Sequence, residues 1–300
     1  MTEPWSPTAF EAFRELYPAT PQLPLPDLAL TEAFARTWSL PDAELDACMR
    51  DAWVGTTVVF VRGYLGNWMP GNLVRPMRAF AALGIDARIA TNAAGATVAT
   101  NARGLAEQLG GDGPVLLCGH SRGGLECLVA TDLDARLRER AVGVLLSQTP
   151  RGPSGVLESL LLRSHDGTLS GARRWAEEWV QRVGLHAIGA ASGGRELTAG
   201  PLAEVVRAID ACARPFPVWQ TASWSSQPTT WLDSFHGRLA EIRPGCAHDG
   251  QFFLEDLLWP GLPHVLLAHV DHAQPVMGGF GFDEVRYWKV LAALFASVTR

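Results

Sequence analysis

The sequence has few features that would bind a metal ion, form disulfides or insert into a membrane. Its five cysteines are scattered and odd in number, without a Cys-x-x-Cys pair, which favours neither a disulfide framework nor a zinc site. No apolar run is long enough to cross a bilayer. Residues 1–7 lack the basic and apolar stretches of a signal peptide. These absences predict a cytoplasmic protein without a transmembrane segment.

Long runs of positive charge are also missing. Lysine and arginine number 25 against 31 acidic residues, for a net charge of −6, which argues against nucleic acid as a partner. The chain has 300 residues, 47% of them apolar, and contains no internal repeat. A single α/β domain of this length can bury a large core. The oligomeric state stays open.

Short apolar runs alternate with helical patterns along most of the chain. This alternation predicts a mostly parallel sheet of about six strands flanked by helices. Helices are expected at 76–83, 97–109 and 282–298, and strands at 56–61, 87–90, 115–118, 141–147, 217–222 and 264–268.

Two parts of the chain depart from this alternation. Residues 1–53 are rich in proline and form an N-terminal extension with helical patches, whose role the sequence does not indicate. Residues 151–215 are helical without a strand, and they divide a core of 54–150 and 216–300. An insertion at this point predicts a lid over a site. Its apolar stripe, which contains Trp175 and Trp179, fits either a lid that lines the site or ordinary packing onto the core.

The most informative stretch is Gly119-His120-Ser121-Arg122-Gly123-Gly124, which lies between a predicted strand and a predicted helix. A serine in such a Gly-x-Ser-x-Gly turn is exposed at the carboxyl end of a sheet, where its hydroxyl can attack a carbonyl. The alternative is a serine that only caps a helix. The strand before it favours the nucleophile.

A serine nucleophile needs a base, and the base needs an acid that orients it. Asp249 lies between the last two predicted strands, and His272 follows the last one, so the chain order is serine, acid, histidine. Asp249-Gly250 also fits a simple turn, and His269 is the second candidate for the base.

The oxyanion of the reaction needs two backbone donors. One is the N–H of Arg122, directly after the nucleophile. The other is expected from Tyr64, within Gly63-Tyr64-Leu65-Gly66, in the loop after the first core strand. The alternative is a glycine-rich loop that only turns the chain. No phosphate-binding glycine motif occurs there.

Together these segments resemble the α/β-hydrolases, and within them the bacterial triacylglycerol lipases and related esterases. Val61-Arg62-Gly63-Tyr64-Leu65-Gly66 is similar to their oxyanion segment, Gly119–Gly124 to their elbow, Asp249-Gly250 to their acid loop, and Asp271-His272 to their histidine segment. The similarity runs from residue 54 to the C-terminus, apart from the insertion.

The sequence departs from this family at two positions. Arg62 replaces the usual histidine of the oxyanion segment. Secreted lipases of this type often hold calcium through an aspartate two residues after the histidine, where this chain has Gln274. We therefore expect no structural calcium, and the family chemistry implies no other metal and no cofactor.

The predicted function is that of a serine hydrolase that cleaves a small-molecule carboxylic ester through an acyl-enzyme on Ser121. A thioesterase, a lactonase or an acyltransferase could use the same triad, and a catalytically silent binding protein could have the same fold. Four tryptophans are candidates for binding an apolar part of the substrate: Trp68, Trp175, Trp179 and Trp224.

Overall fold

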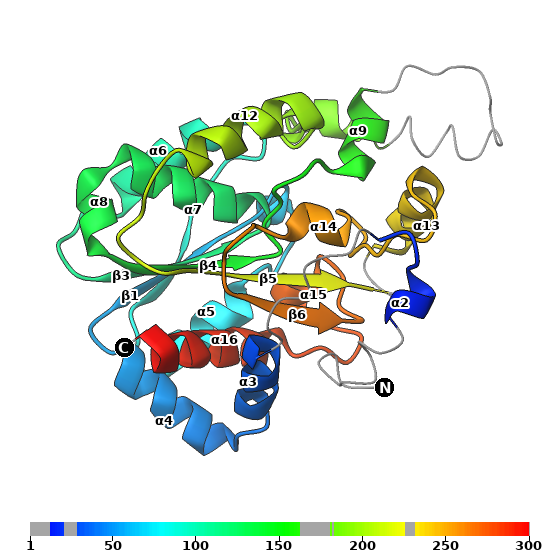
Figure 1. Ribbon diagram of the computed structural model, residues 1–300. Coiled ribbons are helices and arrows are strands. Elements are labelled where there is room, and N and C mark those ends of the chain that lie inside the picture. The colour runs from blue at the N-terminus through cyan, green and yellow to red at the C-terminus, as the bar shows by residue number, and fades with distance from the viewer. Residues whose placement is uncertain (1–12, 21–28, 163–180, 182, 226–231, 300) are drawn as a thin grey trace.

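The computed structural model describes residues 13–20, 29–162, 181, 183–225 and 232–299. In this part of the chain, six strands form one parallel sheet in the order β2-β1-β3-β4-β5-β6, with helices on both faces (Figure 1). The strands are β1 (Thr57–Val61), β2 (Ala87–Ala90), β3 (Val115–His120), β4 (Ala141–Ser147), β5 (Val218–Trp224) and β6 (His264–Ala268). The α/β-hydrolase fold predicted from the sequence is confirmed.

Side chains along each strand point alternately to the two faces of the sheet, and helices cover both faces, which explains why the apolar runs in the sequence are continuous. In β1, Val58 and Phe60 pack into one core cluster, whereas Val59 and Val61 pack into the other. Because successive side chains point to opposite faces, a strand covered on both sides must be apolar at every position. The face toward which Val58 and Phe60 point is called the first face here. The helices that lie over it (Figure 1) include α3 (Ala29–Trp38), α4 (Asp42–Trp53), α5 (Val74–Ala82) and α16 (Glu284–Thr299).

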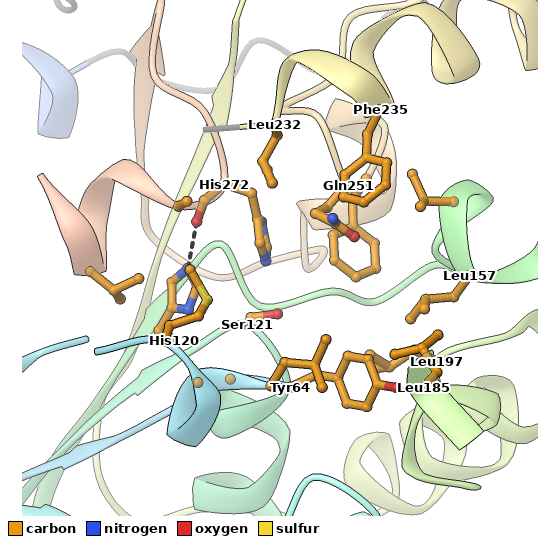
Figure 2. A pocket seen from close by; sticks show the side chains of 18 of the residues that line it. Tyr64, His120, Ser121, Leu157, Leu185, Leu197, Leu232, Phe235, Gln251 and His272 are labelled. Carbon is orange, nitrogen blue, oxygen red and sulfur yellow. Dashed lines mark hydrogen bonds between the residues drawn. The ribbon is translucent and has the colours of Figure 1, made fainter. Parts of the chain in front are cut away.

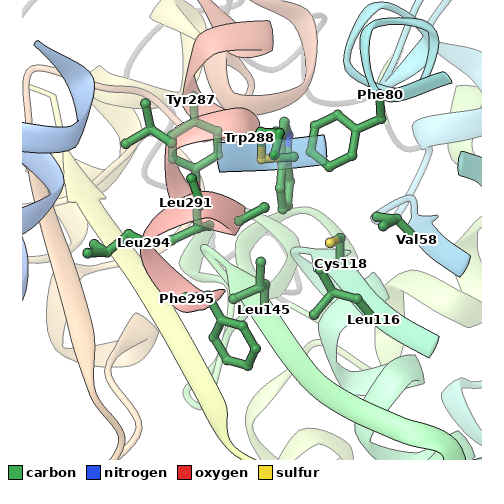
Figure 3. Packing of buried hydrophobic residues seen from close by; sticks show 14 of the residues in the cluster. Val58, Phe80, Leu116, Cys118, Leu145, Tyr287, Trp288, Leu291, Leu294 and Phe295 are labelled. Atoms are coloured by element: carbon green, nitrogen blue, oxygen red, sulfur yellow. The ribbon is translucent and has the colours of Figure 1, made fainter. Parts of the chain in front are cut away.

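The C-terminal helix α16 contributes several large side chains to the first face. Trp288 packs edge-on against Phe60, with ring centroids 5.3 Å apart, and Phe295 lies over the strand position of Gly143, where a Cβ would come within 2.1 Å of its ring. Figure 3 shows these α16 side chains facing the strands. The absence of a side chain at residue 143 thus makes room for the ring of Phe295.

The second face is covered by helices that include the one following the predicted nucleophile. They are α6 (Val98–Gln108), α7 (Arg122–Leu133), α8 (Ala135–Arg140) and α12 (Ala199–Asp210). Helix α12 contacts α7, and its Leu202, Val206 and Ile209 are buried in the core cluster of this face. This part of the predicted insertion therefore belongs to the helical layer of the core.

The rest of the predicted insertion contains α9 (Gly155–Leu161) and α11 (Ala191–Arg195). Residues 163–180 and 182, with Trp175 and Trp179, lie outside the described residues. A lid stays a prediction. Other short elements are α2 (Phe13–Leu16), η1 (Gly66–Trp68), α13 (Asp233–Ile242), α14 (Leu254–Leu257) and α15 (Gln274–Met277).

The helices of the N-terminal region pack onto the core. Both α3 and α4 contact α16, and α3 also contacts β6. The backbone N–H of Leu266, in the edge strand β6, donates to Thr31 Oγ1 at 3.0 Å. Such a bond satisfies an edge amide that could otherwise pair with another chain.

Candidate active site

Ser121 occupies the tight turn between β3 and α7, in a backbone conformation with φ 54° and ψ −130°. This positive φ is sparsely populated by residues other than glycine, and such strain is common at functional sites. The N–H of Ser121 donates to the carbonyl oxygen of Ser147 at 2.8 Å, which holds the turn against the end of β4. The hydroxyl faces a cavity (Figure 2).

The glycines around Ser121 are required by backbone packing. A Cβ on Gly119 would lie 2.4 Å from the Cα of Gly124, and a Cβ on Gly123 would lie 2.3 Å from the carbonyl oxygen of Val61 in β1. Both contacts are with backbone atoms, which cannot rotate away as a side chain can. The sequence motif thus permits close packing of β3, α7 and β1.

Gly123→Ala is expected to lower the free energy of unfolding by about 1–3 kcal/mol or more, because the added methyl overlaps a fixed carbonyl. The matched control is Gly200→Ala in α12, where an added Cβ meets no atom within 4 Å. It should leave stability unchanged or raise it by up to about 1 kcal/mol. Urea unfolding followed by circular dichroism measures both, and equal stability of the two variants would refute the packing argument.

The predicted acid and base lie together. Asp249 Oδ2 and His272 Nδ1 are 2.6 Å apart, and Asp249 is fully buried. The other carboxylate oxygen accepts hydrogen bonds from the backbone N–H groups of Gln251 and Phe252, each at 2.9 Å. Burial by itself raises the pKa of Asp249, but the charge and hydrogen bond of His272 and the two amides outweigh it, so the pKa lies below its usual value.

An ionised Asp249 makes Nδ1 of His272 the donor, which leaves Nε2 with the lone pair that a general base needs. Figure 2 shows the ring of His272 and the hydroxyl of Ser121 facing the same space. Both residues line one cavity. The arrangement can accept a proton from the hydroxyl and hold it as an imidazolium beside a carboxylate.

The peptides on both sides of His272 are held by residues that the sequence did not single out for this purpose. Gln148 Nε2 donates to the carbonyl oxygen of Asp271 at 3.0 Å, and His120 Nε2 donates to that of His272 at 2.8 Å. The N–H of His272 donates to the carbonyl oxygen of Asp249 at 2.8 Å. The imidazole is therefore positioned through its own backbone as well as through the carboxylate.

His120 stays neutral at ordinary pH. Burial and the neighbouring His272 lower its pKa to about 3. His120 lies within the Gly119–Gly124 stretch, so its place next to Ser121 could be read from the sequence. Gln148, which follows β4 at φ 47°, belongs to no motif, and only the fold brings it to the base.

The predicted oxyanion loop lies directly against Ser121. A Cβ on Gly63 would come within 2.8 Å of the Cβ of Ser121, so only glycine allows this approach. Within the described residues, the backbone N–H of Tyr64 donates to no other group. Arg122 is the first residue of α7, so its N–H has no acceptor within the helix. Both amides stay candidates for holding an oxyanion.

The side chain of Arg122 has a separate, structural role. It is fully buried and pairs with Glu126 at 3.0 Å. It also donates to the carbonyl oxygens of Ala93, at 2.8 Å, and Ala94, at 3.1 Å. Arg122 thereby fixes the loop after β2, while its guanidinium lies 5.5 Å from the centre of the Tyr64 ring.

A cavity of about 440 Å³ opens beside Ser121 and His272. Its described lining contains no aspartate, glutamate, lysine or arginine. Figure 2 shows Leu157, Leu185, Leu197, Leu232 and Phe235 around it. The apolar side chains that line it are Leu65, Met69, Val156, Leu157, Leu160, Leu185, Ile188, Leu197, Leu232, Phe235, Phe252, Ala273 and Val276. Such a lining fits an uncharged, largely apolar ligand.

The two described tryptophans among the predicted substrate contacts lie elsewhere. Trp224 is buried in β5, where it packs edge-on against Phe13 with ring centroids 4.8 Å apart. Trp68 is 59% exposed in η1. Neither is among the cavity residues, so the structure does not bring these two tryptophans to the candidate site, and leucines and phenylalanines line the cavity instead. Composition alone could not separate a core tryptophan from a substrate contact.

Gln274, at the position where the resemblance described above would imply an aspartate in a calcium-binding lipase, makes hydrogen bonds within its own loop. Its Oε1 accepts from the N–H of Asp271 at 2.8 Å, and its Nε2 donates to the carbonyl oxygen of Gly279 at 3.2 Å. Among the residues that the structure describes, no group of three metal-ligating side chains occurs. None of the helices in this described part of the chain has the length and apolar character needed to cross a membrane.

Comparison with solved structures identifies the fold. The chain is similar to a metagenomic carboxyl esterase, with a TM-score of 0.59 and 15% identity over 82% of this chain and 76% of that one. It is also similar to the Bacillus licheniformis lipase BlEst2 in its propeptide form, with a TM-score of 0.52 and 18% identity over 79% of this chain. The match spans half of that lipase chain. No protein-family model and no curated protein matches the sequence.

Proposed function

We propose that this protein is a serine hydrolase that cleaves carboxylic esters of uncharged, apolar character through an acyl-enzyme on Ser121. The observation that carries this proposal is the 2.6 Å contact between His272 and the buried Asp249. His272 lines the same cavity as Ser121. Structural similarity to a carboxyl esterase and a lipase supports the fold on which the proposal rests.

The reaction begins when Ser121 Oγ attacks the ester carbonyl carbon and its proton passes to His272 Nε2. The backbone N–H groups of Tyr64 and Arg122 hold the oxyanion of the tetrahedral intermediate. Its collapse breaks the bond to the alcohol oxygen, which takes the proton from His272. Water then attacks the acyl-enzyme, gives a proton to His272 and releases the carboxylic acid as the proton returns to Ser121. Asp249 stabilises the imidazolium in both halves.

The cavity restricts the substrate. At about 440 Å³ it is near the lower end of ligand-pocket volumes, which favours short and medium chains over long ones. An ionised group on the substrate's acyl chain would lose its bound water on entering the cavity, and the described lining offers no opposite charge in return.

A panel of p-nitrophenyl esters tests this proposal. We expect kcat/KM to be higher for the butyrate, hexanoate and octanoate esters than for the palmitate. We also expect kcat/KM for the pentanoate ester to be roughly tenfold or more above that for its charged counterpart, the succinate monoester. If the purified, folded protein hydrolyses none of them above the Ser121→Ala variant, the assignment as an ester hydrolase is wrong. Faster hydrolysis of acyl thioesters would indicate a thioesterase, and faster opening of lactones would indicate a lactonase. Transfer of the acyl group to an added alcohol would indicate an acyltransferase.

A further inference from the structure

The peptide between Gly63 and Tyr64 carries one of the two candidate oxyanion donors, the N–H of Tyr64. The carbonyl oxygen of Gly63, on the other side of this peptide, accepts from the N–H of Gly66 at 3.0 Å. The N–H and C=O of a trans peptide point in opposite directions, so this bond fixes the direction of the donor. The position of the donor then depends on the preceding peptide, which joins Arg62 to Gly63.

A buried asparagine holds that preceding peptide. Asn92 lies in the loop after β2, and its Nδ2 donates to the carbonyl oxygen of Arg62 at 2.7 Å. The same nitrogen donates to Glu126 Oε2, also at 2.7 Å. An amide nitrogen has two hydrogens, so both are used. One side chain therefore connects the oxyanion loop to Glu126 in α7.

Glu126 is itself held by buried donors. Its Oε1 lies 3.0 Å from Nε of Arg122 and accepts from Nδ2 of Asn101 at 2.7 Å. Burial raises the pKa of Glu126, and Arg122, Asn92 and Asn101 oppose this shift. Its described partners are all donors, and the guanidinium of Arg122 stays charged, so they favour the carboxylate. A buried network whose members are all paired is rigid, which keeps Asn92 in place.

This network links the two candidate oxyanion donors to each other. Arg122, whose side chain pairs with Glu126, supplies the second donor through its backbone N–H. The carbonyl oxygen of Arg62 also packs on the first turn of α7, because a Cβ on Gly123 would lie 2.6 Å from it. The contacts run from Arg122 through Glu126 and Asn92 to the backbone of Arg62. They set the distance between the oxyanion loop and the start of α7.

We propose that Asn92 is a positioning residue for the oxyanion site, and that it acts by holding the carbonyl oxygen of Arg62 while Glu126 holds its amide. This inference rests on the proposed ester hydrolysis. Without the Nδ2 donor, the peptide between Arg62 and Gly63 is free to rotate, and the N–H of Tyr64 moves with it. Oxyanion donors act mainly on the transition state, where a small displacement is costly. The loss should therefore fall on kcat.

Two variants of Asn92 test this role. We expect Asn92→Ala to lower kcat for p-nitrophenyl butyrate by roughly 10- to 100-fold, with KM within about twofold of the wild type. Asn92→Asp keeps the side-chain volume, but its carboxyl group has at most one proton, which the Glu126 carboxylate accepts more strongly than the carbonyl of Arg62 does. It should show a similar loss of kcat, and it decides the matter if Asn92→Ala does not fold.

Asn101→Ala is the matched control. Asn101 is also buried and donates to the same carboxylate at the same distance of 2.7 Å. Its other side-chain hydrogen bonds join the N–H and the carbonyl oxygen of Ala93, and Arg122 also donates to that carbonyl at 2.8 Å. Asn101→Ala should lower the free energy of unfolding, because it removes buried hydrogen bonds, but leave kcat within about twofold of the wild type.

A pair of inhibitors separates loss of the oxyanion site from damage to the cavity. Ser121 Oγ adds to the carbonyl carbon of an alkyl trifluoromethyl ketone, the serine proton passes to His272, and the carbonyl oxygen becomes an oxyanion. The matching trifluoromethyl alcohol fills the same cavity without this reaction. Asn92→Ala should weaken inhibition by the ketone by roughly the factor lost from kcat, and inhibition by the alcohol by less than about twofold.

The outcomes separate this inference from the function on which it rests. Unchanged kcat in a folded Asn92 variant overturns the positioning role. An equal loss of kcat in Asn101→Ala also overturns it and assigns the network a general structural role. Equal weakening of the ketone and the alcohol does the same and places the damage in the cavity. If the wild-type protein neither hydrolyses the ester nor binds the ketone, ester cleavage itself is contradicted, and this inference fails with it.

Discussion

Ser121→Ala is expected to reduce kcat for an activated ester by on the order of 10⁶-fold, the loss that follows removal of a triad serine when chemistry limits the rate. In the proposed mechanism, the variant keeps the cavity and the oxyanion donors that bind the ester, but it has no hydroxyl that can be acylated. Hydrolysis of p-nitrophenyl butyrate at saturating substrate measures the effect.

This variant has a clear control for folding. Ser121 has a φ of 54°, which alanine adopts with about the same strain as serine, and no hydrogen bond of the Ser121 hydroxyl to the described residues is lost. The unfolding midpoint should therefore stay close to that of the wild type. A folded Ser121→Ala protein that keeps near-normal kcat would show that another residue is the nucleophile.

His272→Ala is expected to lower kcat by a similar factor, roughly 10⁵- to 10⁶-fold, because no other group accepts the serine proton. The change also leaves Asp249 buried without its partner, which destabilises the protein. His272→Asn is the second variant, since its amide can still donate toward Asp249 but has no basic nitrogen. Stopped-flow release of p-nitrophenol should show no acylation burst in either variant.

His269 provides the matched comparison for the base. It follows β6 at a φ of 61° and is half-buried, and burial lowers its pKa. His269→Asn is the suitable change, because asparagine tolerates this backbone conformation better than alanine does. We expect it to keep the acylation burst. A burst that survives in His272→Asn and disappears in His269→Asn would move the base to His269.

The central sheet could be predicted from sequence because its determinants are local. Thr57–Val61 and Ala141–Ser147 are apolar on both faces, and a strand covered by helices on both sides requires this pattern. The tight turn at Ser121 could be predicted for the same reason, since Gly119, Ser121 and Gly123 lie within one short stretch of the chain and the two glycines meet a steric requirement.

Groups that meet only through the fold could not be predicted. Gln148 lies 123 residues from Asp271, whose carbonyl oxygen it binds, and nothing in its local sequence marks this contact. Trp224 illustrates a second limit of local sequence, because a large apolar side chain fits the core, where the structure places Trp224, as readily as a binding site.

Covalent labelling with a fluorophosphonate tests most directly whether Ser121 is an activated nucleophile. Such a reagent reacts with a serine whose hydroxyl is deprotonated by a neighbouring base, and the phosphoryl group then occupies the position of the tetrahedral intermediate. The account predicts one adduct per chain by intact-mass spectrometry, located on the peptide that contains Ser121. It predicts no adduct in Ser121→Ala and much slower labelling in His272→Asn. An unlabelled wild-type protein, or an adduct on any other residue, would contradict it.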